Sequence, residues 1–267
     1  MRSYAQTNIQ LFNQLRREGY STTELNLIRD AYELAMTCYS CRFSPSGRPF
    51  ISHVVRTASI LASLNLPAQI VAAGLLHNVY STGDFGNRTG RISNTDRQTI
   101  SRTLGREVEE YIIRFPSSYW GSRTIQLARS DPDRLPAIDR AVVLMLLADH
   151  LEHLLDQDVL YYVATERQYY LENSRVAAEI AERFGIIALA AELKDAVREA
   201  ESAELPVELR ADRIRDRSFL IAPRSCRKRL SVTVGRLLAR SAGSLRIEIQ
   251  KLRFLCAKLA KPVKQTS

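Results

Sequence analysis

Residues 47–84, GRPFISHVVRTASILASLNLPAQIVAAGLLHNVYSTGD, decide the fold of this chain. Apolar residues recur at helical spacing on both sides of a short turn at Asn65–Pro67. The second run is apolar nearly all round, a pattern typical of a helix at the centre of a bundle. His53 lies near the start of the first helix and His77 near the end of the second. Antiparallel helices joined by so short a turn would bring those two ends together.

The remaining sequence predicts more helices and no sheet. A capping box at Ser21–Glu24 opens one helix, residues 136–156 form a long and very apolar one, and two more are expected around residues 160–184 and from Gly185 onward. Residues 81–94 and 115–135 have no clear period, so we expect loops there. Because runs that alternate with a period of two are absent from the sequence, the predicted class is an all-α bundle.

Asp149 lies within the apolar run VVLMLLADHLEH. An unpaired carboxylate in such a segment is costly to bury and needs a cation or hydrogen-bond donors. Together with His53 and His77 it would suit a first-row divalent metal such as manganese, iron or zinc. Two other interpretations stay open at this point: each histidine is a satisfied core residue, and Asp149 pairs with an arginine.

Composition excludes several classes of protein. The chain of 267 residues has an ordinary apolar fraction of 45% and lacks the roughly 18 uninterrupted apolar residues of a membrane span. Its start does not resemble a signal peptide. Four cysteines do not make a disulfide scaffold, so a reducing cytoplasm is the expected location. Cys38 and Cys41 have CxxC spacing, but two buried cysteines explain them better than a redox or zinc pair.

The positive charge is concentrated at the C-terminal end. From Leu205 onward the chain holds 16 Lys and Arg against 4 Asp and Glu, a net charge of +12, whereas the whole chain carries +9. Residues 245–259 predict an amphipathic helix whose polar side is basic. Such a helix either docks on the body, lies on an anionic membrane surface through residues 224–264, or binds a protein or nucleic acid. Aromatic residues are scarce there, which counts against single-strand recognition.

Four separated blocks resemble the N-terminal hydrolase half of the RelA/SpoT alarmone enzymes. They are Gly47–His53 (GRPFISH), Leu75–Asn78 (LLHN), Leu147–Glu152 (LADHLE) and residues 181–197 (AERFGIIALAAELKDAV). That half is an HD domain, an all-helical metal-dependent phosphohydrolase. The resemblance implies an HD domain at residues 1–203, followed by a basic, partly amphipathic helical extension at residues 204–267.

The resemblance also implies a ligand and a set of site residues. The metal would be a divalent ion, and the resemblance to the family favours manganese. Its ligands would be His53, His77, Asn78 and Asp149. The substrate would be a phosphorylated small molecule or nucleotide, with guanosine alarmones such as ppGpp as the family precedent. Residues expected to bind it are Arg42, Arg48, Arg56, Tyr80, His150 and His153. For His150 and His153 a solvated helix surface is the competing interpretation, and for Tyr80 it is packing.

The sequence departs from the family pattern at positions that bind the metal or activate water in the family. Asn78 replaces the aspartate of the His-Asp pair, so metal occupancy should be weaker. Ser81 and Thr82 occupy the positions of an acidic pair and cannot act as bases near neutral pH. Asp84 is the nearby carboxylate that could take over that role.

Two hypotheses of function follow. The first is a metal-dependent phosphohydrolase or pyrophosphohydrolase, related to ppGpp hydrolases, with altered or reduced activity. The second is an inactive HD module, a pseudoenzyme that binds a nucleotide or a protein partner and is held at a surface by its basic tail. In either case the protein would be cytoplasmic or peripheral to a membrane. The sequence does not indicate an oligomeric state.

Overall fold

The structure is a computed structural model that describes residues 3–86, 92–115, 120–209 and 219–221. One compact unit ends at Ile221. The basic extension expected at residues 204–267 therefore falls mostly outside the described residues, and the amphipathic pattern within residues 224–264 does so entirely. Its helical structure and its role stay predictions.

The described chain is essentially all helical, which confirms the predicted class. In order its elements are α1 (Asn8–Arg17), α2 (Thr22–Cys38), β1 (Arg42–Phe43), α3 (Phe50–Ser63), α4 (Ala68–Leu76), α5 (Val79–Thr82), α6 (Asn94–Leu104), α7 (Arg106–Arg114), α8 (Arg123–Ser130), η1 (Pro132–Arg134), α9 (Ala137–Asp156), η2 (Asp158–Tyr161), α10 (Ala164–Arg183), α11 (Ile187–Ser202), η3 (Val207–Leu209) and β2 (Phe219–Leu220).

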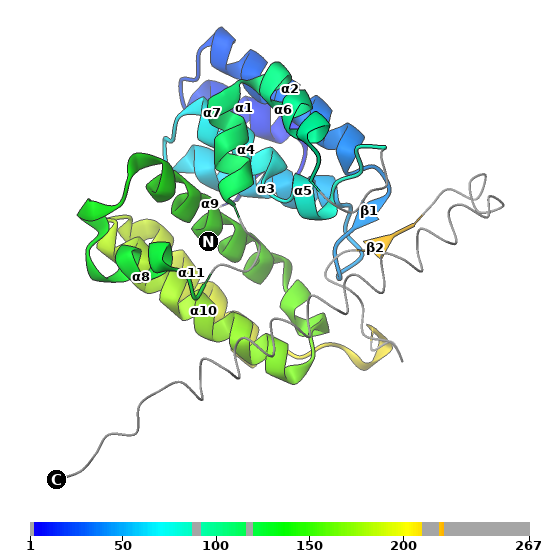
Figure 1. Ribbon diagram of the computed structural model, residues 1–267. Coiled ribbons are helices and arrows are strands. Elements are labelled where there is room, and N and C mark those ends of the chain that lie inside the picture. The colour runs from blue at the N-terminus through cyan, green and yellow to red at the C-terminus, as the bar shows by residue number, and fades with distance from the viewer. Residues whose placement is uncertain (1–2, 87–91, 116–119, 210–218, 222–267) are drawn as a thin grey trace. The chain divides into compact units, whose positions relative to one another are not determined.

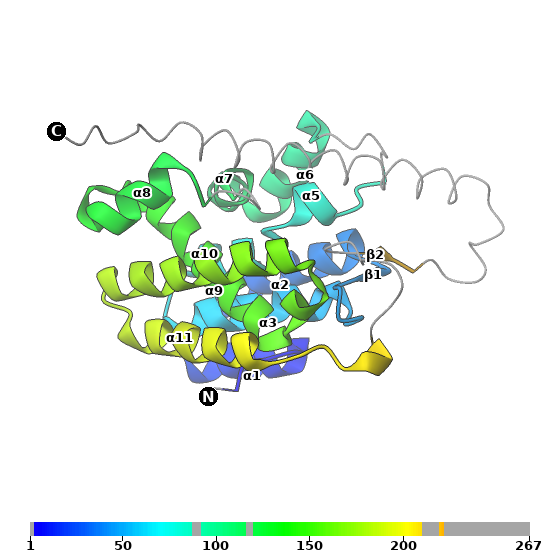
Figure 2. The same cartoon turned by 90° about the horizontal axis from the view of Figure 1, so that it is seen from below.

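Helices α3 and α4 form the hairpin predicted from residues 47–84, and α9 crosses beside them. Figure 1 shows α1–α7 gathered on one side of α9 and α8, α10 and α11 on the other. Figure 2 shows α10 and α11 running side by side. Every residue of α4 except Gln69 is buried, and so is every residue of α9 from Ala141 to Glu152. These two apolar helices therefore lie in the centre, as expected for helices without a polar face.

The local signals for helix α2 are confirmed. The Ser21 side chain accepts a hydrogen bond from the backbone N–H of Glu24, and the Glu24 carboxylate accepts one from the backbone N–H of Ser21. Pro67 and Pro136 are the N-cap residues of α4 and α9. Proline suits a helix start because it has no backbone N–H that would be left without a partner there.

Two details of the prediction were wrong. Residues 115–135 were expected to be loop, but α8 lies within them and buries only Ile125 and Ala128. So short an apolar stripe gives little periodicity to detect. The loop expected from residue 81 begins later, because the short helix α5 extends to Thr82.

Extended structure in the described residues is confined to the two-residue strands β1 and β2 and one bridge between Phe43 and Pro49. The strands pair antiparallel, with Arg42 opposite Leu220 and Phe43 opposite Phe219. Residues 219–221 therefore contact the loop that precedes α3. None of the described helices combines the length and the apolar character required to cross a bilayer.

Gly74 permits the close approach of α4 to α3. A Cβ at this position would lie 2.4 Å from Cδ1 of Leu61, a fully buried side chain. We predict that Gly74→Ala lowers the free energy of unfolding by about 1–2 kcal/mol, because overpacking outweighs the gain in helix propensity. Urea denaturation measures the change. In a Leu61→Val background, which lacks the clashing carbon, the same substitution should cost less. Equal costs in the two backgrounds would contradict this account of the contact.

Candidate metal centre

Three helices supply the candidate ligands. His53 lies in the first turn of α3, His77 follows the last residue of α4, and Asp149 lies in the second half of α9. The residues are 2%, 2% and 9% exposed. Because α3 and α4 are antiparallel and α9 packs on both, residues far apart in sequence meet at one point.

The three side chains present their metal-binding atoms to one another. His77 Nε2 is 3.0 Å from Asp149 Oδ1, His53 Nε2 is 3.4 Å from the same oxygen, and the two Nε2 atoms are 3.3 Å apart. The predicted convergence is therefore present in the described structure. Their use as metal ligands stays a prediction.

The other nitrogen of each ring fixes its tautomer. His77 Nδ1 is 2.7 Å from the carbonyl oxygen of Gly74, which can only accept a hydrogen bond. His53 Nδ1 contacts the carboxylate of Glu152. Both Nδ1 atoms must therefore carry hydrogen, and in the neutral rings both Nε2 atoms hold a lone pair. Two lone pairs and a carboxylate oxygen thus face each other.

Such a group of acceptors needs a positive charge among them. Asp149 Oδ1 is buried and has no hydrogen-bond partner among the described residues. Atoms that each lie about 2.1 Å from one ion are about 3.0–3.4 Å apart at octahedral or tetrahedral angles, and the observed separations fall in that range. Imidazole nitrogen and carboxylate oxygen together suit divalent transition metals. The residues present therefore fit a metal ion.

The charge of Asp149 is maintained by its neighbours. Burial would raise the pKa of this carboxyl group, but the positive charge that His153, His77 and His53 carry when they are protonated holds it below its usual value. The group is therefore an anion inside the protein, which is the state that binds a cation.

Asn78 lies beside the cluster at the start of α5. Its Nδ2 is 2.8 Å from His77 Nε2, the nitrogen that faces Asp149. Rotation of the amide by a half turn would present the oxygen instead. In that orientation Asn78 would offer a neutral oxygen and contribute no charge; its use as a metal ligand stays a prediction.

Glu152 belongs to the site, and the sequence analysis did not select it. It is 1% exposed, accepts from His53 Nδ1 and is 2.6 Å from Arg48 Nη2. Burial alone would raise its pKa, but His53 and Arg48 lower it to about 2. A carboxylate that holds the remote nitrogen of a metal-binding histidine orients the ring and increases its basicity. The detectable signal was its position three residues after Asp149, on the same face of α9.

Arg48 is engaged by carboxylates. Besides Glu152, its Nη1 lies 2.8 Å from Asp156 Oδ1. Arg56 is 9% exposed, and its Nη1 lies 3.8 Å from Glu152 Oε1. This Nη1 donates no hydrogen bond to any of the described residues. Burial lowers the pKa of Arg42, whose Nε also has no hydrogen-bond partner among the described residues. Arg42 and Arg56 thus have donors to offer to a phosphate, whereas Arg48 already neutralises two acids.

The two histidines after Asp149 have different surroundings. His153 contacts Asp149, and its ring is tilted by 42° against that of His53, with ring centres 4.7 Å apart. His150 is turned toward Trp120, whose Nε1–H donates to His150 Nε2 at 2.7 Å, and lies flat on Tyr170. His150 is 4% exposed, so the interpretation of a solvated helix surface was wrong for it.

Ser81 and Thr82, at the positions of the family's acidic pair, lie on α5 together with Tyr80, and Asp84 follows just after the helix. The Ser81 hydroxyl donates to the carbonyl of Asn78, and the exposed Asp84 carboxylate accepts from the backbone N–H of Gly86. Thr82 is half-buried beside them. The Tyr80 hydroxyl donates to Glu109 at 2.9 Å, so it is already engaged by a carboxylate. None of these four roles is tested by the geometry.

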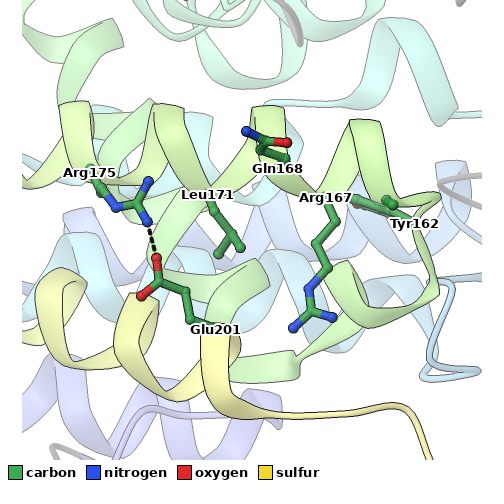
Figure 3. Close-up of a pocket in the computed structure, with 7 residues that line it drawn as sticks. Tyr162, Arg167, Gln168, Leu171, Arg175 and Glu201 are labelled. Atoms are coloured by element: carbon green, nitrogen blue, oxygen red, sulfur yellow. Dashed lines mark hydrogen bonds and ion pairs between the residues drawn. The ribbon is translucent and has the colours of Figure 1, made fainter.

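A cavity of about 500 Å³ lies elsewhere, along α10 and the end of α11. Figure 3 shows Arg175 paired with Glu201 and Arg167 directed toward the end of α11. There Arg167 donates to the carbonyls of Ala200 and Ala203. This cavity therefore does not present free cations to a phosphate, and we place the site at the histidine cluster instead.

Comparison with known proteins confirms the resemblance to RelA/SpoT proteins. A family model described as a domain of unknown function (DUF6817) matches residues 40–118, which include His53 and His77. A relative named "Probable GTP pyrophosphokinase", from Mycobacterium leprae, is 26% identical over 78% of this chain and 26% of its own length. The bifunctional (p)ppGpp synthase/hydrolase RelA of Mycobacterium tuberculosis is 36% identical over 26% of this chain and 10% of its own length.

The chain thus spans about a quarter or less of these relatives. A solved structure, described as a metazoan ortholog of SpoT that hydrolyses ppGpp, aligns with 67% of this chain and 97% of its own. Its TM-score is 0.47 at 17% sequence identity, a likeness too distant to bear on function.

We predict that Arg48→Met lowers the free energy of unfolding by about 3–5 kcal/mol, because it leaves the Glu152 carboxylate buried beside one fewer cation. Guanidinium denaturation at neutral pH measures the change. The double variant Arg48→Met/Glu152→Gln should recover much of the loss. A change below about 0.5 kcal/mol in the single variant would show that Arg48 is free for substrate rather than committed to Glu152.

Proposed function

We propose that this chain is a metal-dependent phosphohydrolase of the HD type, with a phosphorylated guanosine nucleotide as its substrate class. The observation that carries the proposal is the convergence of His53 Nε2, His77 Nε2 and Asp149 Oδ1 within 3.0–3.4 Å. The relatives support the nucleotide class, since one is named a probable GTP pyrophosphokinase and the other a bifunctional (p)ppGpp synthase/hydrolase.

A bound divalent ion would supply Lewis-acid polarisation of a phosphoryl oxygen and a more acidic water. The chain's own residues contribute the rest. His53, His77 and Asp149 hold the ion, and Glu152 keeps the ring of His53 in the ligating tautomer. Arg42 and Arg56 offer buried guanidinium donors to the phosphates. Asp84 is the carboxylate nearest in sequence to the missing acidic pair. Its side chain is exposed, so it can contact water directly.

A non-catalytic nucleotide-binding module is the second candidate. It is favoured by Ser81 and Thr82, whose hydroxyl groups cannot serve as bases near neutral pH. The Ser81 hydroxyl already donates to the carbonyl of Asn78. Such a module would retain the arginines and the fold and would bind its nucleotide without turnover.

We predict that Asp149→Asn abolishes hydrolysis of guanosine tetraphosphate by the full chain and reduces bound divalent metal more than about 100-fold, because an amide replaces the only anionic candidate ligand. Pyrophosphate release and metal analysis by mass spectrometry measure the two effects. The matched control is Asp139→Asn on the same helix, where the partly exposed carboxylate pairs with Arg114. Hydrolysis that survives Asp149→Asn would refute this metal centre as the catalytic site. Thermal stabilisation by the nucleotide without turnover in the wild type would establish the binding module.

For the basic tail we propose an anionic membrane surface as the partner of residues 224–264. We predict that the full chain floats with vesicles containing phosphatidylserine and that deletion of residues 224–267 abolishes flotation. Each basic side chain near the surface adds about 1 kcal/mol, so salt should weaken the binding. Neutral vesicles are the control. Equal flotation of the full and truncated chains would exclude the tail as the membrane contact.

A further inference from the structure

His153 has the same arrangement as the two histidines of the proposed metal centre. Its Nδ1 lies 2.8 Å from Asp158 Oδ2, and Asp158 is 1% exposed. Its Nε2 is directed to Asp149 Oδ1, at 3.6 Å. Asp149 Oδ1 is therefore surrounded by three Nε2 atoms, at 3.0, 3.4 and 3.6 Å. In all three rings a buried acceptor engages Nδ1.

The contact between His153 and Asp149 is not itself a hydrogen bond. A separation of 3.6 Å is too long for one, and Asp149 Oδ1 has no hydrogen-bond partner among the described residues. The ring of His153 is thus held from behind by Asp158 and leaves Nε2 available at the front. His53, Glu152 and His153 form a second group that could hold a metal ion. One nitrogen or oxygen atom from each of these residues lies within 4.8 Å of the others.

A separate cation between His53, Glu152 and His153 is disfavoured by charge. Glu152 already contacts His53 Nδ1 and Arg48, and Arg56 Nη1 lies 3.8 Å away. Two guanidinium groups would repel a divalent ion beside this carboxylate. Among the described residues this leaves Asp149, whose Oδ1 lies 3.6 Å from Nε2 of His153, as the link between His153 and an ion held by His53 and His77.

We infer that His153 is a ligand of that ion and compensates for Asn78, so that the centre is built from three imidazoles and one carboxylate. This inference rests on the proposed function. Imidazole nitrogen suits zinc and iron, whereas carboxylate oxygen suits manganese and magnesium. Exchange of one carboxylate for an imidazole should therefore move the preference of the centre from Mn²⁺ toward Zn²⁺.

The direct test counts imidazoles in the full-length wild type loaded with Zn²⁺, by X-ray absorption at the zinc edge. Three imidazole rings per zinc support the inference, and two would overturn it. Because this measurement needs no variant, it does not depend on whether a substitution at a buried position folds.

The variant test is competition dialysis against equal Zn²⁺ and Mn²⁺, read by metal analysis. Every nitrogen and oxygen site favours zinc to some degree, so the informative quantity is the change in the Zn/Mn ratio. We expect His153→Asn to lower zinc affinity at least 10-fold and His153→Asn/Asn78→Asp to lower the Zn/Mn ratio further. The control is His150→Asn, which removes a buried histidine of α9 that contacts Trp120 instead and should leave the ratio unchanged.

The two levels of the proposal fail differently. A wild-type chain that binds neither ion would remove the metal centre, and with it both the proposed function and this inference. A wild type that binds zinc with an affinity and ratio unchanged in His153→Asn would overturn the inference alone.

Discussion

The candidate site depends on one electrostatic constraint: three hydrogen-bond acceptors, Nε2 of His53, Nε2 of His77 and Oδ1 of Asp149, face one another in the protein interior. The lone pairs of two imidazoles point at a buried carboxylate oxygen within 3.4 Å, and both rings have their hydrogens engaged on the opposite side. In a low-dielectric interior such an arrangement is unfavourable unless a cation or a proton lies among the acceptors. Without a metal, His153 partly supplies that charge: burial opposes its protonated form, but Asp158 and Asp149 outweigh burial and raise its pKa to about 10.

The rest of the molecule holds these groups in place. Gly74 lets α4 approach α3, the carbonyl of the same residue accepts from His77, and the nearly fully buried α4 cannot move without exposing apolar surface. Arg48 anchors Glu152, which anchors His53. The site is therefore built on three packed helices with a second layer of ion pairs, which is how precise ligand geometry is maintained.

The sequence pattern predicted that His53, His77 and Asp149 converge, but it did not predict which residues surround them. The convergence of residues 53, 77 and 149 followed from the helical pattern, the short turn at Asn65–Pro67 and one acid in an apolar run. Glu152 and the division of roles between His150 and His153 did not follow, because spacing along one helix does not show which neighbour each side chain meets. His153 faces α3, whereas His150 meets Trp120 and Tyr170. Helix α8 escaped detection because only two of its residues are buried.

Anomalous diffraction from crystals of the full chain grown with a divalent transition metal would test the central claim most directly. The account predicts one strong peak in the anomalous difference map between Nε2 of His53, Nε2 of His77 and Oδ1 of Asp149. A well-ordered site with no anomalous signal at saturating metal, and with the three side chains bonded to each other through protons, would contradict it.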